Sequence, residues 1–188
     1  MRRSSAEVCA SGSTAVRAAT GFAFTEGPVW IAETASLIFS DIRGNAMHRL
    51  REDGSVVEYR RPSNFANGST RDNEGRLVTC EHGTSRLVRE EFDGRLTTLV
   101  SHWQDRALNS PNDVIVDRRG RIWFTDPAYG RMAGYGIERA QELDFQGVFI
   151  CDPDGALHLV ADDFEQPNGL CLTDDEQVLL VSDTCRNH

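Results

Sequence analysis

The 188-residue sequence has little positive charge and no long apolar run. Its 20 Lys and Arg residues are outnumbered by 29 Asp and Glu residues, so the net charge is -9 at pH 7. Nucleic acids and anionic membranes require a basic surface to meet their phosphates, so neither is an expected partner. No segment stays apolar over the roughly 20 residues that a transmembrane helix needs. We therefore expect a soluble protein.

The first 15 residues lack the apolar core of a secretory signal. Arg2 and Arg3 open the chain, followed by serines and other small residues rather than an apolar run. We predict that residues 1–15 form a disordered extension, that residues 16–188 form the folded domain, and that the protein is cytoplasmic.

Cysteine is scarce and lacks the spacing of a metal or disulfide framework. The sequence has 5 cysteines, an odd number, and no Cys-x-x-Cys pair. A zinc site or disulfide network is therefore not expected. Cys80, Cys151 and Cys171 fall within predicted strands, which favours small buried residues in a reducing compartment.

The sequence contains an internal repeat with four copies. The segments FTEGPVW, FANGSTR, SPNDVIV and QPNGLCL align on Gly27, Gly68, Asp113 and Gly169, at intervals of roughly 40 to 55 residues. Each segment is followed by a short apolar run that ends at an acid, namely Asp41, Glu81, Asp126 or Asp183. Such a period, with four short strands in each copy, is typical of β-propeller blades.

The repeat predicts an all-β protein with about three and a half blades. In the third copy, alternation and turn residues predict strands at 114–117, 122–125, 147–151 and 156–160. The blades are expected near residues 24–60, 65–101, 110–161 and 166–188, the last being incomplete. The second strand of each copy is apolar enough to be buried on both faces.

Propeller geometry predicts a shared site. The innermost strands of all blades begin at the same end of the central axis, so the residues at their starts face one another. These residues are Glu26, Asn67, Asn112 with Asp113, and Asn168. Asp41, Glu81, Asp126 and Asp183 return to the same end, which predicts an acidic mouth. Carboxylate and amide oxygens are the ligands that hard cations such as calcium prefer.

These motifs resemble the gluconolactonase, regucalcin and luciferin-regenerating-enzyme superfamily of six-bladed propellers. The matching stretches are TEGPVW, NSPNDV, WFTDP, and QPNGL followed by VSDT. The resemblance implies that Glu26 and Asn168 are metal ligands and that Asn112 and Asp113 contact substrate or water. The family's further acidic ligand, in a Pro-Asp-Gly motif one blade on, has no counterpart here, and we assign no general base.

Three further features have competing interpretations. Asn112 and Asn168 bind ligand or simply cap turns, and Asn67 occupies the equivalent place in the second blade without a matching functional motif. His82, beside Glu81, contacts a substrate oxygen or is a surface imidazole. The insertion at residues 127–146 is a lid whose tyrosines and arginines recognise hydroxyls or a carboxylate, or it is a disordered loop.

Metal-dependent hydrolysis of a sugar lactone is the function that these observations favour. In this scheme Glu26 and Asn168 hold a divalent cation, with calcium expected before zinc or manganese. Asn112, Asn67 and His82 bind the substrate, and Asp113 is the candidate catalytic residue. The sequence contains no Gly-x-Ser-x-Gly motif or phosphate-binding loop that would indicate another mechanism. The alternative is a non-catalytic cation-binding scaffold or an inactive fragment.

The chain is also shorter than the resemblance implies. Six blades of the observed period need about 250 residues. We therefore expect an open ring that self-associates through its exposed edges and hydrolyses lactones poorly.

Overall fold

The computed structural model describes residues 14–186, which contain strands and two short 3-10 helices. Within this range, no helix has the length and apolarity needed to cross a bilayer. Residues 1–13 of the predicted disordered extension lie outside the described residues. Its last two residues, Thr14 and Ala15, are irregular and exposed.

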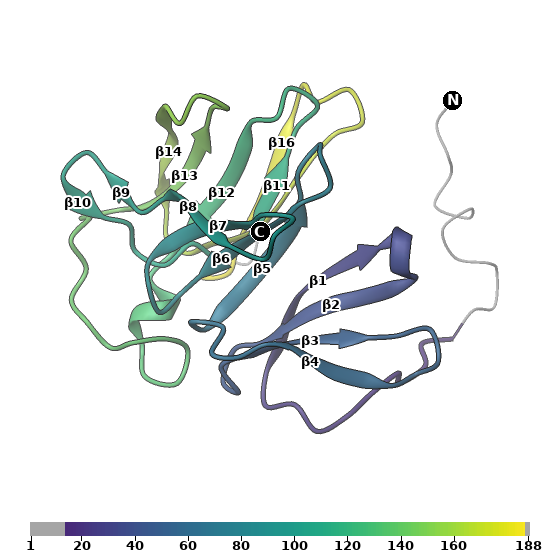
Figure 1. Ribbon diagram of the computed structural model, residues 1–188. Helices are drawn as coiled ribbons and strands as arrows, with labels where there is room; N and C mark the ends of the chain where they lie inside the picture. Colours follow the sequence, from purple (N-terminus) through teal and green to yellow (C-terminus); the bar gives the residue numbers. More distant parts are fainter. Residues whose placement is uncertain (1–13, 187–188) are drawn as a thin grey trace.

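Within the described residues, the fold contains three four-stranded antiparallel sheets and two two-stranded sheets (Figure 1). The first sheet contains β1 (Thr25–Ile31), β2 (Ser36–Asp41), β3 (Ala46–Leu50) and β4 (Val56–Arg60). The second contains β5 (Ala66–Arg71), β6 (Leu77–Glu81), β7 (Arg86–Glu90) and β8 (Leu96–Val100). The third contains β11 (Val114–Val116), β12 (Ile122–Asp126), β13 (Gln146–Cys151) and β14 (Leu157–Phe164). The last contains β15 (Pro167–Leu172) and β16 (Leu179–Asp183).

Consecutive strands pair within every sheet, which confirms the predicted all-β class and the four-stranded unit. The third and fourth strands of each complete sheet are joined by the predicted Asp-Gly turns. In the third sheet Gly155 has a φ of 89°, a left-handed conformation that glycine adopts without strain.

Shorter elements lie between the sheets. The hairpin of β9 (His102–Trp103) and β10 (Arg106–Ala107) was not predicted, because strands of this length are too short to show alternation. The 3-10 helix η2 (Ala32–Thr34) lies between β1 and β2, and η3 (Tyr129–Arg131) lies in the insertion between β12 and β13.

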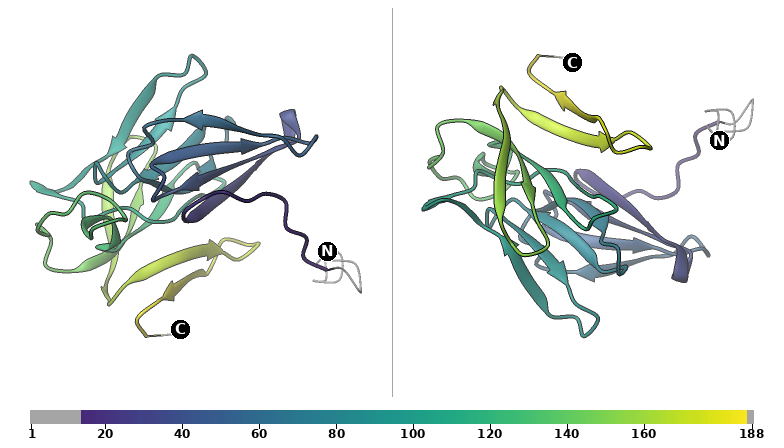
Figure 2. Two further views of the ribbon diagram at one scale, coloured as in Figure 1. Left: turned by 90° about the horizontal axis from the view of Figure 1, so that it is seen from below. Right: turned by 90° about the horizontal axis from the view of Figure 1, so that it is seen from above.

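The sheets form an arc with their innermost strands side by side (Figure 2). β1 packs against β5, β5 against β11, and β11 against β15. A Cβ atom on Gly27 would lie 2.1 Å from the Asn67 carbonyl oxygen, and one on Gly68 would lie 2.5 Å from that of Asn112. Gly27 and Gly68 therefore have no side chain because the neighbouring inner strand approaches too closely, whereas the nearest atom to a Cβ on Gly169 would be 3.5 Å away.

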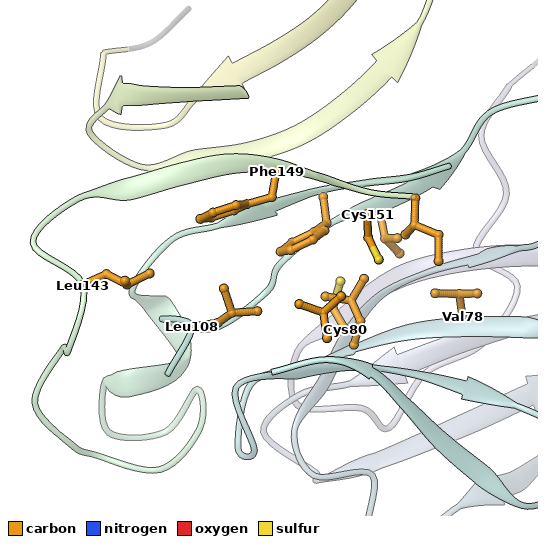
Figure 3. Close-up of a cluster of buried hydrophobic side chains, with 11 residues drawn as sticks. Val78, Cys80, Leu108, Leu143, Phe149 and Cys151 are labelled. Carbon is orange, nitrogen blue, oxygen red and sulfur yellow. The ribbon is translucent and has the colours of Figure 1, made fainter. Parts of the chain in front are cut away.

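The main hydrophobic core fills the space between the second and third sheets (Figure 3). The rings of Phe124 and Phe149 stack there with centroids 5.4 Å apart. Cys80 and Cys151 are buried in this core, as predicted. The same prediction is wrong for Cys171, which is exposed, because its sheet has only two strands among residues 14–186.

The second strands differ according to their neighbours. β6 is buried along its whole length, and β2 and β12 are almost as deeply buried. β16 alternates between exposed and half-buried residues up to Asp183, so the prediction of burial on both faces is wrong for this strand.

Candidate functional site

A cavity of about 300 Å³ lies where the inner strands meet. Glu26, Asn67, Asn112 and Asn168 line it, each from a different sheet or from the loop that leads into one. Hollows of about 500 and 380 Å³ lie instead among the hairpin turns at the other ends of the strands. The structure therefore brings these four predicted residues together in one place.

A repeated backbone irregularity aims these side chains. The pairing register shifts between Glu26 and Val29 in β1, between Ala66 and Ser69 in β5, and between Pro167 and Leu170 in β15. A β-bulge bends the strand and changes the direction of its side chains. The same bulge in three sheets turns the site residue of each one toward the shared cavity.

Two of the amide side chains have their NH₂ groups bound to the protein. Asn67 Nδ2 donates to His82 Nε2 at 3.1 Å, and Asn168 Nδ2 donates to Thr184 Oγ1 at 3.1 Å. Each amide then has its Oδ1 atom left to accept from a ligand or to coordinate a cation. Thr184 was not predicted as a site residue, although it belongs to the VSDT stretch that carried the resemblance.

His82 is buried, with 1% of its surface exposed, so its interpretation as a surface imidazole is wrong. Its Nδ1 lies 2.9 Å from the Tyr135 carbonyl oxygen, which can only accept, so Nδ1 carries the proton and Nε2 accepts from Asn67. Burial and, to a smaller extent, the Arg139 charge lower the pKa of His82 to about 4, against the opposing effect of the Tyr135 carbonyl. Both ring nitrogens are engaged, so in this structure His82 orients Asn67. Its direct contact with substrate stays a prediction.

Asp113 lies behind the cavity lining, among β5, β11 and β15. Its Oδ2 accepts from the Leu170 N–H at 3.3 Å and its Oδ1 from the Val114 N–H at 2.9 Å. Burial raises the pKa of Asp113. Burial also raises the pKa of Glu26, and the negative charge of Asp113 adds to this effect. Two carboxylates in this situation favour a nearby cation.

The donor set suits a hard cation because it combines carboxylate and amide oxygens. Within residues 14–186, no group of three or more His, Cys, Asp or Glu side chains is arranged to hold a metal. A cation here would thus depend on the amide oxygens of Asn168 and its neighbours as well as on Glu26.

The prediction of an acidic mouth is wrong. Asp41 accepts from the N–H groups of Ala23 and Phe24 at 3.1 and 2.8 Å, and Asp126 accepts from those of Asn109 and Ser110 at 2.7 and 2.8 Å. Asp183 binds Glu165 and Gln166 in the same way. These carboxylates fasten the loop that precedes each inner strand and do not line the cavity.

Glu81 has the same fastening role with different partners. It accepts from Asn64 Nδ2 at 3.1 Å, Thr84 Oγ1 at 2.6 Å and Arg86 Nε at 2.8 Å. The loop before β5 is therefore held by a hydrogen bond between two side chains. The corresponding loops before β1, β11 and β15 are held through their backbone N–H groups.

The insertion between β12 and β13 forms one side of the cavity. Tyr129, Met132 and Tyr135 contribute from the insertion, and Phe24 and Ile42 contribute from the first sheet and its loop. The insertion was predicted to lie here, but Phe24, Ile42 and Met132 were not singled out. Apolar residues in loops carry no sequence signal that separates a cavity wall from ordinary packing.

The insertion's arginines do not have their predicted role. Arg131 donates to the carbonyl oxygens of Asn109 and Leu108 at 2.8 and 2.6 Å and also to that of Ala140. Arg139 donates to the carbonyl oxygen of His82 at 2.9 Å. Both guanidinium groups therefore hold the insertion in place, and the prediction that they recognise a ligand is wrong.

These sheets and their shared cavity define a β-propeller-type protein with a cavity where its inner strands meet. The profile described as SMP-30/Gluconolactonase/LRE-like region matches residues 24–188, and the chain belongs to this family. It is 30% identical over 182 residues to a gluconolactonase from Zymomonas mobilis, covering 89% of this chain and 51% of that protein.

Solved structures agree with the fold. A gluconolactonase from Xanthomonas campestris superposes with a TM-score of 0.83 at 41% identity, covering 87% of this chain and 55% of that one. A calcium-binding protein, regucalcin, from Agrobacterium tumefaciens superposes with a TM-score of 0.67 at 17% identity, covering 88% of this chain and 52% of that one. The chain thus spans about half the length of the relatives it matches.

Proposed function

We propose that this protein hydrolyses a lactone in the axial cavity with the help of a divalent cation. The observation that carries the proposal is the convergence of Glu26, Asn67, Asn112 and Asn168 on one cavity, with the buried Asp113 behind them. Membership of the family and 30% identity to a gluconolactonase support the reaction class. A sugar lactone is the first substrate to test.

Each residue has a distinct task in this scheme. Glu26 and Asn168 would hold the cation, with calcium as the first candidate and zinc or manganese as others. When bound, the cation supplies a Lewis acid that polarises the lactone carbonyl. Asn112 orients the lactone, and Asn67, fixed by His82, binds a polar group of the substrate.

In this scheme Asp113 would position the attacking water from behind the cavity lining, where its carboxylate also accepts from the N–H groups of Val114 and Leu170. Burial raises its pKa, which makes its carboxylate a stronger hydrogen-bond acceptor than an exposed aspartate. The water oxygen bonds to the carbonyl carbon and the ring C–O bond breaks. The leaving oxygen gains the proton that the attacking water releases, and the product is an open-chain hydroxy acid.

A non-catalytic cation-binding scaffold is the second candidate. It is favoured by the engagement of both ring nitrogens of His82, which leaves the cavity without a free imidazole base. The two candidates differ in turnover, since a scaffold binds a cation without consuming lactone.

The test is hydrolysis of glucono-1,5-lactone with calcium, zinc or manganese, and again with a chelator. Asn112→Ala should lower kcat/KM about tenfold to a hundredfold, because the substrate loses its alignment. Asn73→Ala is the matched control, since Asn73 bonds the Asp117 carbonyl oxygen at 3.0 Å, away from the cavity. Metal binding without turnover of any lactone would favour the scaffold.

A further inference from the structure

Tyr129 lines the cavity and carries a polar atom that has no partner. Its Oη is buried and makes no hydrogen bond within residues 14–186. The other side chains in this range with buried, unpartnered polar atoms are Arg49, Arg60 and Glu81, and none of them lines the cavity. Buried hydroxyls in native proteins are almost always hydrogen-bonded, so an unpartnered one at a cavity indicates a ligand that accepts from it.

The backbone on both sides of Tyr129 is fixed. The Ala128 N–H donates to Gln146 Oε1 at 2.7 Å, and the Gly130 N–H donates to Ser110 Oγ at 2.8 Å. These acceptors lie at the start of β13 and in the loop before β11, so two neighbouring segments hold the turn. A donor placed in advance needs no reorganisation when charge develops on its acceptor.

The cavity lining contains few groups that can pass a proton to a ligand. Glu26 is assigned to the cation, and both ring nitrogens of His82 are engaged. The amides donate hydrogen bonds but retain their protons. The hydroxyls of Tyr129, Tyr135 and Thr184 are the remaining groups in the lining.

Tyr129 differs from the other two hydroxyl residues in its surroundings. Tyr135 Oη accepts from Arg43 at 2.7 Å in an exposed contact and retains its own O–H to donate. Thr184 Oγ1 accepts from Asn168 Nδ2 at 3.1 Å, also in an exposed contact. Water competes for both of these hydroxyls, whereas Tyr129 Oη is enclosed. A hydrogen bond shielded from water is electrostatically stronger, which favours Tyr129 as the donor.

The proposed reaction needs a proton at the ring oxygen of the lactone. The ring C–O bond breaks with its electron pair on that oxygen, and an alkoxide leaves poorly unless it is protonated as it forms. The cation is assigned to the carbonyl oxygen. The ring oxygen therefore requires a separate donor.

We propose that Tyr129 is the donor to the ring oxygen and the catalytic acid of this reaction. This inference rests on the proposed lactone hydrolysis and adds a residue to it. As the C–O bond breaks, the ring oxygen takes the Oη proton, and the phenolate of Tyr129 recovers a proton from the attacking water. The sum is one lactone and one water converted into one hydroxy acid.

The experiment compares two δ-lactones that differ in their leaving oxygen. δ-Valerolactone leaves as an alkoxide, whereas dihydrocoumarin leaves as a phenolate, which does not need to be protonated. Tyr129→Phe in the full chain should lower kcat/KM about a hundredfold for δ-valerolactone and about threefold or less for dihydrocoumarin. The ratio is the readout, because a loss of folded enzyme lowers both rates equally. Equal losses for the two lactones, or no loss, would overturn the proposal.

The other two tyrosines of the sequence provide matched controls. Tyr59 Oη donates to Glu90 Oε1 at 2.8 Å, away from the cavity, so Tyr59→Phe should leave the ratio of the two lactones unchanged. Tyr135→Phe removes the neighbouring hydroxyl of the cavity and should also leave this ratio unchanged. A ratio that changes as much in Tyr135→Phe as in Tyr129→Phe would overturn the assignment to Tyr129.

Stability gives a readout that does not depend on turnover. Tyr129→Phe removes a hydroxyl without a partner and should keep or raise the midpoint of urea unfolding. Tyr59→Phe breaks the hydrogen bond to Glu90 and should lower this midpoint. An equal fall in both variants would show that the protein itself binds Tyr129 Oη, and the proposal would be wrong.

A chain that does not hydrolyse δ-valerolactone still tests the inference. The same lactone then serves as a binding probe in calorimetry. Binding that is about tenfold weaker in Tyr129→Phe than in the wild type would support Tyr129 as the donor and assign the failure to the proposed hydrolysis. Equal binding to the two proteins, or binding to neither, would overturn the inference.

Discussion

The sequence does not decide whether His82 contacts a substrate or is a surface imidazole, and burial determines its chemistry. It lies at the cavity, donates to the Tyr135 carbonyl oxygen and accepts from Asn67. An imidazole in this state is neutral, and protonating Nε2 would break its bond to the Asn67 amide. The position of Asn67 therefore depends on the protonation state of His82.

The first prediction is a pH effect on stability. The pKa of His82 is lowered from 6.5 to about 4, mainly by burial, so between these values the unfolded chain binds more protons than the folded chain. Its contribution is complete above pH 6.5 and is lost as the pH falls to about 4, a change of about 3 kcal/mol. Urea unfolding at several pH values should show this loss in the wild type and not in His82→Gln.

An exposed histidine provides the control for this measurement. His102→Gln should keep the pH dependence of the wild type, because His102 lies on an exposed strand. The same pH dependence in His82→Gln and the wild type would contradict the assignment of a buried neutral imidazole.

The second prediction ranks two cavity residues by charge. Glu26→Gln should weaken calcium binding about tenfold or more, because it removes a charge as well as altering a ligand oxygen. Asn67→Ala should weaken it less, since it removes only a neutral amide. Calorimetric titration with calcium measures both, and equal losses would refute the ranking.

At the scale of elements, a carboxylate at the end of each second strand fastens the loop before the inner strand. Asp41, Asp126 and Asp183 achieve this with backbone N–H groups. Because the inner strand begins directly after that loop, these bonds set where Glu26 and its counterparts enter the cavity. The carboxylate of each repeat thus helps to position the site residue of the same repeat.

The third prediction tests this device. Asp41→Ala removes hydrogen bonds from Ala23, Phe24 and Gly44 and should destabilise the fold by about 2–4 kcal/mol. Asp53→Ala is the control, since Asp53 accepts hydrogen bonds from Ser55 in an exposed turn, and it should destabilise the fold much less than Asp41→Ala. Denaturant unfolding measures both variants, and similar losses would show that Asp41 has no special role.

The fourth prediction concerns the insertion. Arg131→Met removes the guanidinium that donates to the carbonyl oxygens of Leu108 and Asn109, the second of which keeps its hydrogen bond from Ser85 Oγ, and should loosen the insertion. Hydrogen exchange of the amides at residues 128–140 should become about tenfold faster or more, whereas exchange in β12 should change little. Arg106→Met, at an exposed residue bound to Glu142 and Asp144, should leave that segment unchanged.

At the scale of the whole molecule, the arc of sheets ends on an open strand. Within the described residues, β16 pairs only with β15. Leu180 in β16 is 55% exposed, and Val178 just before the strand is 50% exposed. An apolar strand with a free edge is a template for pairing with another chain. This edge is the surface through which copies of the chain are expected to associate.

The fifth prediction follows from that edge. Sedimentation velocity should detect association of the wild type at micromolar concentration, and Leu180→Lys should reduce it. Phe92→Lys is the control, because Phe92 is 80% exposed but lies in a turn. A wild type that remains monomeric, or an equal effect of both variants, would contradict this assignment.

Several features were predictable from the sequence because they depend on short-range rules or on a repeat. Alternation and Asp-Gly turns act over a few residues, so most strand positions follow from them. The repeat then places Glu26, Asn67, Asn112 and Asn168 at equivalent points of equivalent strands. Equivalent points in a propeller meet at the axis, so their convergence needed no side-chain detail.

Tertiary structure alone decided which partner each polar group finds. Asp41 and Asp126 could have faced the cavity, but unpaired N–H groups of the preceding loop lie next to them and bind them instead. The side of the cavity that the insertion forms depends on contacts such as that between Arg43 and Tyr135, 92 positions apart. A local pattern carries no information about such contacts, because a buried polar group is satisfied by whatever the complete fold brings within hydrogen-bonding distance.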